Sequence, residues 1–133
     1  MGLSPEITVM ISPSSIQFQW KESHLSLVPY VNIDLRKMAP VQIGEKAEIP
    51  GTVLVGVFDP QSELPSYPDK FPILQMIFEY GIGKIFEKQL LPSLRPIITV
   101  RGIDSLKEVF FGYQHALISM VIMKAGAQAV RFE

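Results

Sequence analysis

Residues 6–20 read EITVMISPSSIQFQW, and the pattern of this stretch sets the interpretation of the first half of the chain. On both sides of the cluster at 12–15, which is typical of a turn, every second side chain is large and apolar. A period of two predicts two half-buried strands joined by a tight connection. The alternation resumes over residues 25–35, and Pro29 within it indicates an edge strand or a bulge, because proline cannot donate to a ladder. We therefore expect an antiparallel meander with one face toward solvent.

The next apolar run, residues 52–58, reads TVLVGVF and is rich in β-branched side chains. Such a run predicts a central strand that is buried on both faces. Residues 59–72 follow and carry four prolines. An irregular segment of this length is uncommon in a compact domain and is often functional. A rigid surface connector is the alternative interpretation.

Two helices and two strands are expected in the second half. Asp69 can cap a helix that continues to Ile85, although the sequence Gly81-Ile82-Gly83 leaves a break there open. Residues 97–100 predict a short buried strand. Ser105 and Glu108 match a capping box, which predicts a second long helix from there to Gly126. Its apolar residues fall on both sides, so both sides should be covered. Residues 128–132 alternate again and predict a final strand.

These elements predict an α+β fold, in which an N-terminal antiparallel β-meander precedes a βαβαβ-like half. We expect one globular domain over 1–133 with a single mixed sheet and two long helices. Residues 1–58 should be mostly β, residues 59–72 a proline-rich loop, and residues 73–133 helix, strand, helix and strand. Alternating strands and helices favour parallel pairing through crossover helices.

Composition excludes several classes of protein. The 133 residues include 12 basic and 13 acidic side chains and no cysteine. A net charge of -1 argues against nucleic-acid binding through bulk electrostatics, and the absence of cysteine excludes disulfides and thiolate chemistry. No apolar stretch approaches the roughly 20 residues of a membrane-spanning helix. No secretory signal is recognisable at the start, so a cytoplasmic protein is expected.

One cluster of residues could bind a ligand. If the strand ending at Phe58 and the strand ending at Val100 are parallel neighbours, their carboxyl ends share one edge, where open α/β sheets bind ligands. The predicted site there comprises Asp59, Arg101, Asp104 and Ser105, with Tyr67 and Lys70 as contacts from the proline-rich loop. Two carboxylates and an arginine suit a phosphorylated or anionic small molecule. Turn formation, helix capping and a surface ion pair are the alternative roles for these residues.

No catalytic motif and no metal site is recognisable. His115 and Ser119 are four residues apart, but nothing places an acid behind the histidine, so they fall short of a catalytic triad. Two isolated histidines also lack metal-ligand spacing. No cofactor is indicated.

The low charged fraction, 19%, and the all-round apolar second helix favour an interaction or assembly module. We expect a homo-oligomer, with a two-fold dimer as its commonest form, or a subunit of a larger complex with a protein partner. Phe111, Ile118 and Ile122 are the predicted interface residues. The alternative is a small ligand-binding domain or enzyme that uses the edge at Asp59, Arg101 and Asp104.

Overall fold

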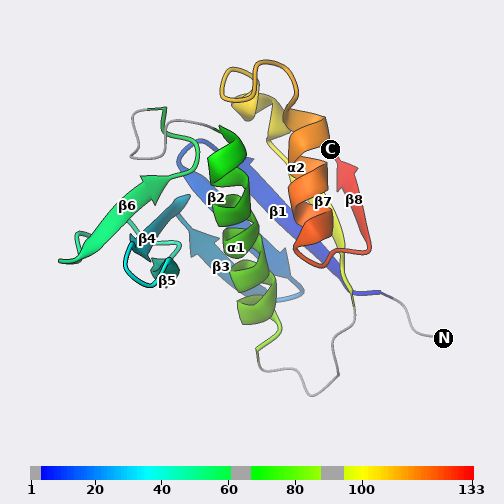
Figure 1. Cartoon of the computed structure of the whole chain (residues 1–133). Coiled ribbons are helices and arrows are strands. Elements are labelled where there is room, and N and C mark those ends of the chain that lie inside the picture. The colour runs from blue at the N-terminus through cyan, green and yellow to red at the C-terminus, as the bar shows by residue number, and fades with distance from the viewer. Residues whose placement is uncertain (1–3, 61–66, 88–94) are drawn as a thin grey trace.

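The computed structural model describes residues 4–60, 67–87 and 95–133 (Figure 1). In these ranges the chain forms eight strands, two α-helices and one short 3-10 helix. The elements follow the order β1 (Glu6–Ser12), β2 (Ser15–Trp20), β3 (Ser23–Leu27), β4 (Tyr30–Asp34), β5 (Ala39–Ile43), β6 (Thr52–Gly56), α1 (Tyr67–Ile85), β7 (Ile97–Arg101), η1 (Ile103–Leu106), α2 (Gln114–Lys124) and β8 (Ala129–Phe132). The α+β fold with antiparallel strands at the N-terminal end is confirmed.

Five strands make the larger sheet, sheet A, in the order β3-β2-β1-β7-β8. The hairpin expected from residues 6–20 is present, with Val9 opposite Phe18. On its other side β1 runs parallel to β7, and β7 runs parallel to β8. Val9, Phe18 and Val100 are all buried, because alternate side chains of neighbouring strands point to the same face. The period-two pattern therefore builds the core of this sheet.

A second sheet, sheet B, was not expected. The stretch 25–35 is two strands: β3 closes sheet A, and β4 is the central strand of sheet B, in the order β5-β4-β6. Pro29 lies at the junction, where the Tyr30 amide donates to the Val28 carbonyl at 2.8 Å. Because proline ends the ladder with β2, the chain is free to turn into a different sheet. The expectation of one mixed sheet is thus wrong in the number of sheets.

The run at 52–58 is also placed differently from the expectation of a central strand. Among the described residues its strand, β6, pairs only with β4 and lies at the edge of sheet B. Thr52, Val53 and Leu54 are half-buried, and full burial begins at Val55. A β-branched run shows that a strand is at least partly buried, but it does not show how many neighbours the strand has.

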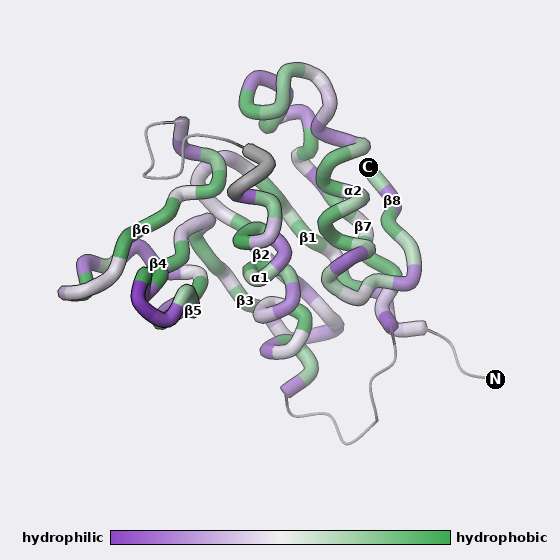
Figure 2. The backbone as a smooth tube through the Cα atoms, in the orientation of Figure 1, coloured by the Kyte–Doolittle hydropathy of each residue, from purple (hydrophilic) through white to green (hydrophobic). Residues whose placement is uncertain are grey.

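Both helices lie on the same face of sheet A, with α1 over β2 and β3 and α2 beside β8 (Figure 1). The tube coloured by hydropathy shows green apolar positions along β1, α1 and α2 where these elements meet (Figure 2). Helix α1 is continuous through Gly81 and Gly83, so the alternative of a break is not realised. A Cβ atom on Gly81 would lie 2.2 Å from Cζ of Phe18, which explains why a glycine stands at this helix position.

The second helix is shorter than expected. Residues 103–106 form η1, residues 107–113 form a turn, and α2 begins only at Gln114. The capping-box prediction is wrong: the Ser105 hydroxyl donates to the carbonyls of Gly102 (2.6 Å) and Ile11 (3.2 Å) instead of capping a helix. Phe111 (φ 53°) and Gly112 (φ 89°) have left-handed backbones, which end any helix passing through them.

Candidate interaction site

The charged residues predicted to share one edge are held in two separate groups. The prediction assumed that the strands ending at Phe58 and Val100 are parallel neighbours. This assumption is wrong, because β6 belongs to sheet B and β7 to sheet A. Arg101 ends β7 and donates from Nε to Oε2 of Glu133 at 2.8 Å. Asp104 lies in η1, where its carboxylate accepts a long hydrogen bond of 3.4 Å from the Gln114 side chain. Arg101, Asp104 and the adjacent Ser105 therefore have partners within the chain.

Asp59 and Lys70 form the second group, at the junction of sheet B and α1. The Lys70 ammonium donates to the carbonyls of Asp59 (2.6 Å) and Gly56 (3.2 Å) and is 2% exposed. Burial lowers the pKa of Lys70 below its ordinary value, and the Asp59 carboxylate opposes this change. Tyr67 begins α1, and its side chain is outside the described part of the structure. Lys70 thus connects the end of β6 to the helix.

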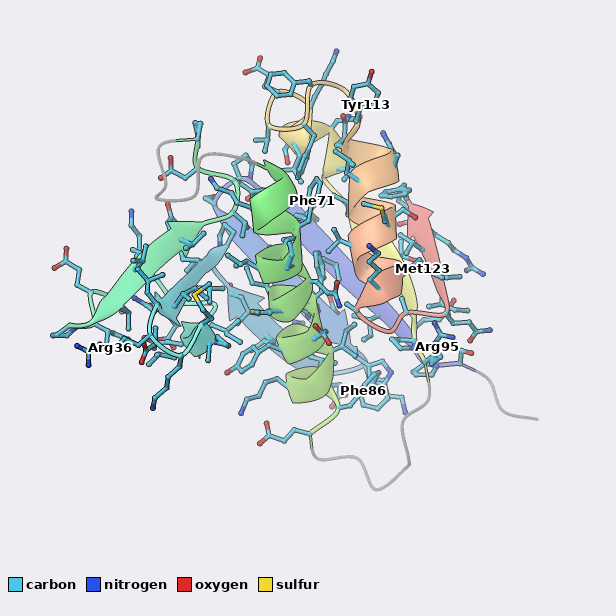
Figure 3. All side chains as sticks on the ribbon, viewed as in Figure 1. Arg36, Phe71, Phe86, Arg95, Tyr113 and Met123 are labelled. Carbon is cyan, nitrogen blue, oxygen red and sulfur yellow. The ribbon has the colours of Figure 1, made fainter. Side chains whose placement is uncertain are left out.

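A turn between η1 and α2, residues 107–113, displays two aromatic side chains. Phe111 is 80% exposed and Tyr113 is 68% exposed. Figure 3 places Tyr113 at the upper end of the molecule, above α2. We call residues 107–113 the aromatic turn. Phe110, which belongs to the same turn, is buried, so the aromatic turn combines one buried ring with two exposed rings.

Backbone hydrogen bonds fix the shape of the aromatic turn. The Gly112 amide donates to the Lys107 carbonyl at 2.9 Å, and the Tyr113 amide donates to the Phe110 carbonyl at 2.9 Å. Phe110 anchors the turn to the core through ring contacts with Phe58 (5.9 Å) and Phe71 (6.4 Å). The exposed rings are therefore carried on an ordered support.

Phe111 is the strained residue of this turn. A positive φ is uncommon for a residue with a Cβ and costs about 1 kcal/mol or more. A glycine would adopt the same backbone without that cost. Phe111 therefore exposes a large apolar ring to solvent and has a left-handed backbone conformation that glycine would adopt more easily. Strained residues of this kind cluster at functional sites, so the exposed ring of Phe111 is a candidate contact.

The three predicted interface residues differ in exposure. Phe111 is on the surface, but Ile118 and Ile122 are 0% exposed and belong to the core on the inner side of α2. As a correction, these three residues do not form one outer face. The predicted face counted residues 106–113 as helical, and those residues are not part of α2.

A recess of about 360 Å³ lies on sheet B. Asn32, in the middle of β4, is 1% exposed and lines it. Its side-chain amide donates to the Ala47 carbonyl (2.9 Å) and to the Thr52 hydroxyl (3.2 Å). Its buried Oδ1 has no hydrogen-bond partner among the described residues. Ile49, Pro50 and Leu54 supply apolar walls, and Glu48 also lines the recess.

Sequence reasoning missed Tyr113 and Asn32. Phe110, Phe111 and Tyr113 have core spacing if a helix is assumed, and Gly112 was the local signal against that assumption. Asn32 was detectable as an amide inside an otherwise apolar alternation.

No protein-family model matches this chain, and no curated protein matches its sequence. Within residues 4–60, 67–87 and 95–133, no cluster of three or more potential metal ligands is present. Among the described helices, none has the length and apolar character needed to cross a membrane.

Proposed function

We propose that this protein is an interaction or assembly module, which works as a homo-oligomer or as a subunit of a larger complex. The aromatic turn is its contact surface. The observation that supports this function is the exposure of Phe111 and Tyr113, 80% and 68%, on a turn whose backbone is fixed. A cytoplasmic location and a protein partner are part of the proposal.

Exposed aromatic rings suit this role for two reasons. Tyrosine is enriched at binding hot spots, and an aromatic ring buries roughly 150–250 Å² when it is covered. An ordered support also lowers the conformational entropy that binding would remove. Two rings supply less than the roughly 1,200 Å² of a stable standard interface, so we expect a weak association through this surface alone.

The alternative is binding of an anionic small molecule by Asp59, Arg101 and Asp104. It has less support, because Arg101 is engaged with Glu133 and Asp59 lies beside Lys70. A ligand at Arg101 would have to compete with an ion pair already made within the chain.

Sedimentation velocity tests the proposed function. The wild type should show a sedimentation coefficient that rises with concentration, up to the highest soluble concentration. Phe111→Gly should remain monomeric there and unfold at a higher temperature, because glycine relieves the positive φ. A gain in stability with a loss of association separates an interaction role from a structural one.

The matched control removes exposed apolar side chains elsewhere. Met38→Ser with Val41→Ser alters two exposed residues on the β4–β5 hairpin. This variant should associate like the wild type. A wild type that is monomeric throughout, with no binding partner retained by the turn, would refute the proposal. Equal association of Phe111→Gly and wild type would refute the role of the turn.

A further inference from the structure

The recess on sheet B requires an occupant of particular chemistry. Its walls include the apolar side chains of Ile49, Pro50 and Leu54. Asn32 also lines it, and the buried Oδ1 of Asn32 has no partner among the described residues. An unsatisfied buried acceptor is costly, so a donor brought to it stabilises the complex. The matching occupant has an apolar body and one hydrogen-bond donor at its tip.

Tyrosine has this combination, and this chain displays one. Tyr113 is 68% exposed on the aromatic turn, where its ring is apolar and its hydroxyl can donate. We infer that the aromatic turn of one copy binds in the sheet B recess of a second copy, with the Tyr113 hydroxyl donating to Asn32. This inference rests on the proposed function and names the partner of the same surface.

Oδ1 of Asn32 is shielded from solvent in the free chain. Residues 45–49 form neither helix nor strand, and Ala47, Glu48 and Ile49 line the recess. The inferred contact therefore requires this segment to shift outward as the ring enters, with the loss of the Asn32–Ala47 hydrogen bond, while strands β4 and β6 keep their pairing.

Charges near the two surfaces fit the same contact. Lys107 and Glu108 are exposed on the aromatic turn, and Lys46 and Glu48 are exposed on the segment that borders the recess. Each surface thus offers one positive and one negative side chain to the other. Pairing of Lys107 with Glu48 and of Glu108 with Lys46 would set the orientation of the contact.

The aromatic turn and sheet B lie at different places on the molecule (Figure 1). A contact between two different surfaces is heterologous, so copies add head to tail and form an open chain or a ring. This symmetry differs from the two-fold dimer expected from the sequence, in which one surface meets itself.

Complementation between two defective variants tests the inference. Tyr113→Ala removes the inserted ring and leaves the recess intact. Leu54→Arg places a charged side chain in the recess wall and leaves the turn intact. Each variant alone should be monomeric in sedimentation velocity, and an equimolar mixture should form heterodimers, because one intact turn meets one intact recess.

Tyr113→Phe isolates the hydroxyl. The ring is retained and one hydrogen bond to Asn32 is lost, so association should weaken about tenfold. Should Leu54→Arg fail to fold, Ala47→Leu fills the recess without a charge and takes its place in the mixture.

The outcomes separate this inference from the proposed function. Assembly could require Phe111 and yet be unchanged by Leu54→Arg and Ala47→Leu. This result would show that the recess is not the binding site, and it would agree with the proposed assembly function. If the equimolar mixture of Tyr113→Ala and Leu54→Arg stays monomeric, the inference is also overturned. That result would indicate that the aromatic turns of two copies contact each other. A wild type monomeric at every concentration overturns self-association itself.

Discussion

Sheets A and B differ in how they are held together. In sheet A, Ile7, Val9 and Ile98 are 0% exposed beneath two helices, and apolar packing fills the space between sheet and helices. In sheet B the central strand carries a buried amide, Asn32, and the outer strand β5 leaves Val41 exposed. The same alternating pattern therefore builds a packed core in one sheet and a partly polar scaffold with a recess in the other.

The largest expected effect tests the close packing of α1 on sheet A. In Gly81→Ala the new Cβ meets the buried ring of Phe18, which also contacts Phe78 edge-on at 6.0 Å. Because Phe18 is 1% exposed, its ring can move only against packed neighbours, so the free energy of unfolding should fall by about 2–3 kcal/mol. Urea denaturation measures this change.

Gly83→Ala is the matched control, because a Cβ there meets nothing within 4 Å. The same substitution should raise the free energy of unfolding by about 0.5–1 kcal/mol, since alanine is the better helix former. Two changes of the same sign would contradict the close approach of α1 to Phe18.

The next effect concerns sheet B. Asn32→Ala removes the side-chain hydrogen bonds to Ala47 and Thr52, which tie the 45–49 segment to β4. Loss of these bonds should lower the free energy of unfolding by about 1–2 kcal/mol. Hydrogen exchange should quicken at the amides of the segment and of β6 more than at those of β1.

Gln42, opposite Asn32 on β5, is the control for this substitution. Its side chain donates to the exposed Glu45, so Gln42→Ala should change stability by less than about 0.5 kcal/mol. An equal loss in both variants would mean that the buried amide of Asn32 has no special part in sheet B.

The smallest expected effect lies where α1 meets the end of β6. Lys70→Met removes the donor to the carbonyls of Gly56 and Asp59 and should cost about 1 kcal/mol near neutral pH. Because burial lowers the pKa of Lys70 in the folded state, the unfolded chain binds the proton more tightly. The stability of the wild type should therefore rise relative to Lys70→Met as pH increases toward the ordinary lysine value of 10.5.

Thermal unfolding of both proteins between neutral and alkaline pH measures this difference. A difference that shrinks as pH rises would mean that the folded state favours charged Lys70. Burial would then not be the main influence on its pKa.

Local patterns in the sequence predicted the first hairpin and the first helix, whereas the capping box at Ser105 and Glu108 was a wrong prediction. The β1–β2 hairpin follows from the period-two alternation around residues 12–15, and the fold class follows from the order of elements. The partners of strands that are distant in the sequence did not follow, because such pairing is decided by residues far apart in the chain. The predicted site required the strand ending at Val100 to be a parallel neighbour of the strand ending at Phe58, but β7 pairs with β1 and β8 instead.

The candidate site was less predictable than the fold. The charged residues were correctly placed near strand ends, but their predicted proximity depended on a strand pairing that does not occur. The aromatic turn was concealed because Phe110, Phe111 and Tyr113 fit a helical period. In the structure Phe111 has a left-handed backbone, and the Phe110 ring contacts Phe58 and Phe71, which are distant in the sequence. Exposure of a large aromatic residue cannot be read from its type, since such residues are usually buried.

A dilution series followed by two-dimensional amide NMR tests the central claim, that this protein associates through the aromatic turn. As concentration rises, the amides of residues 107–113 and the ring signals of Phe111 and Tyr113 should shift together with the amides of 45–54. The open-face residues of sheet A, such as Gln17 and Gln19, should keep their positions. Shifts centred on Arg101 and Asp104, or no shift at the aromatic turn while the mass increases, would contradict the account.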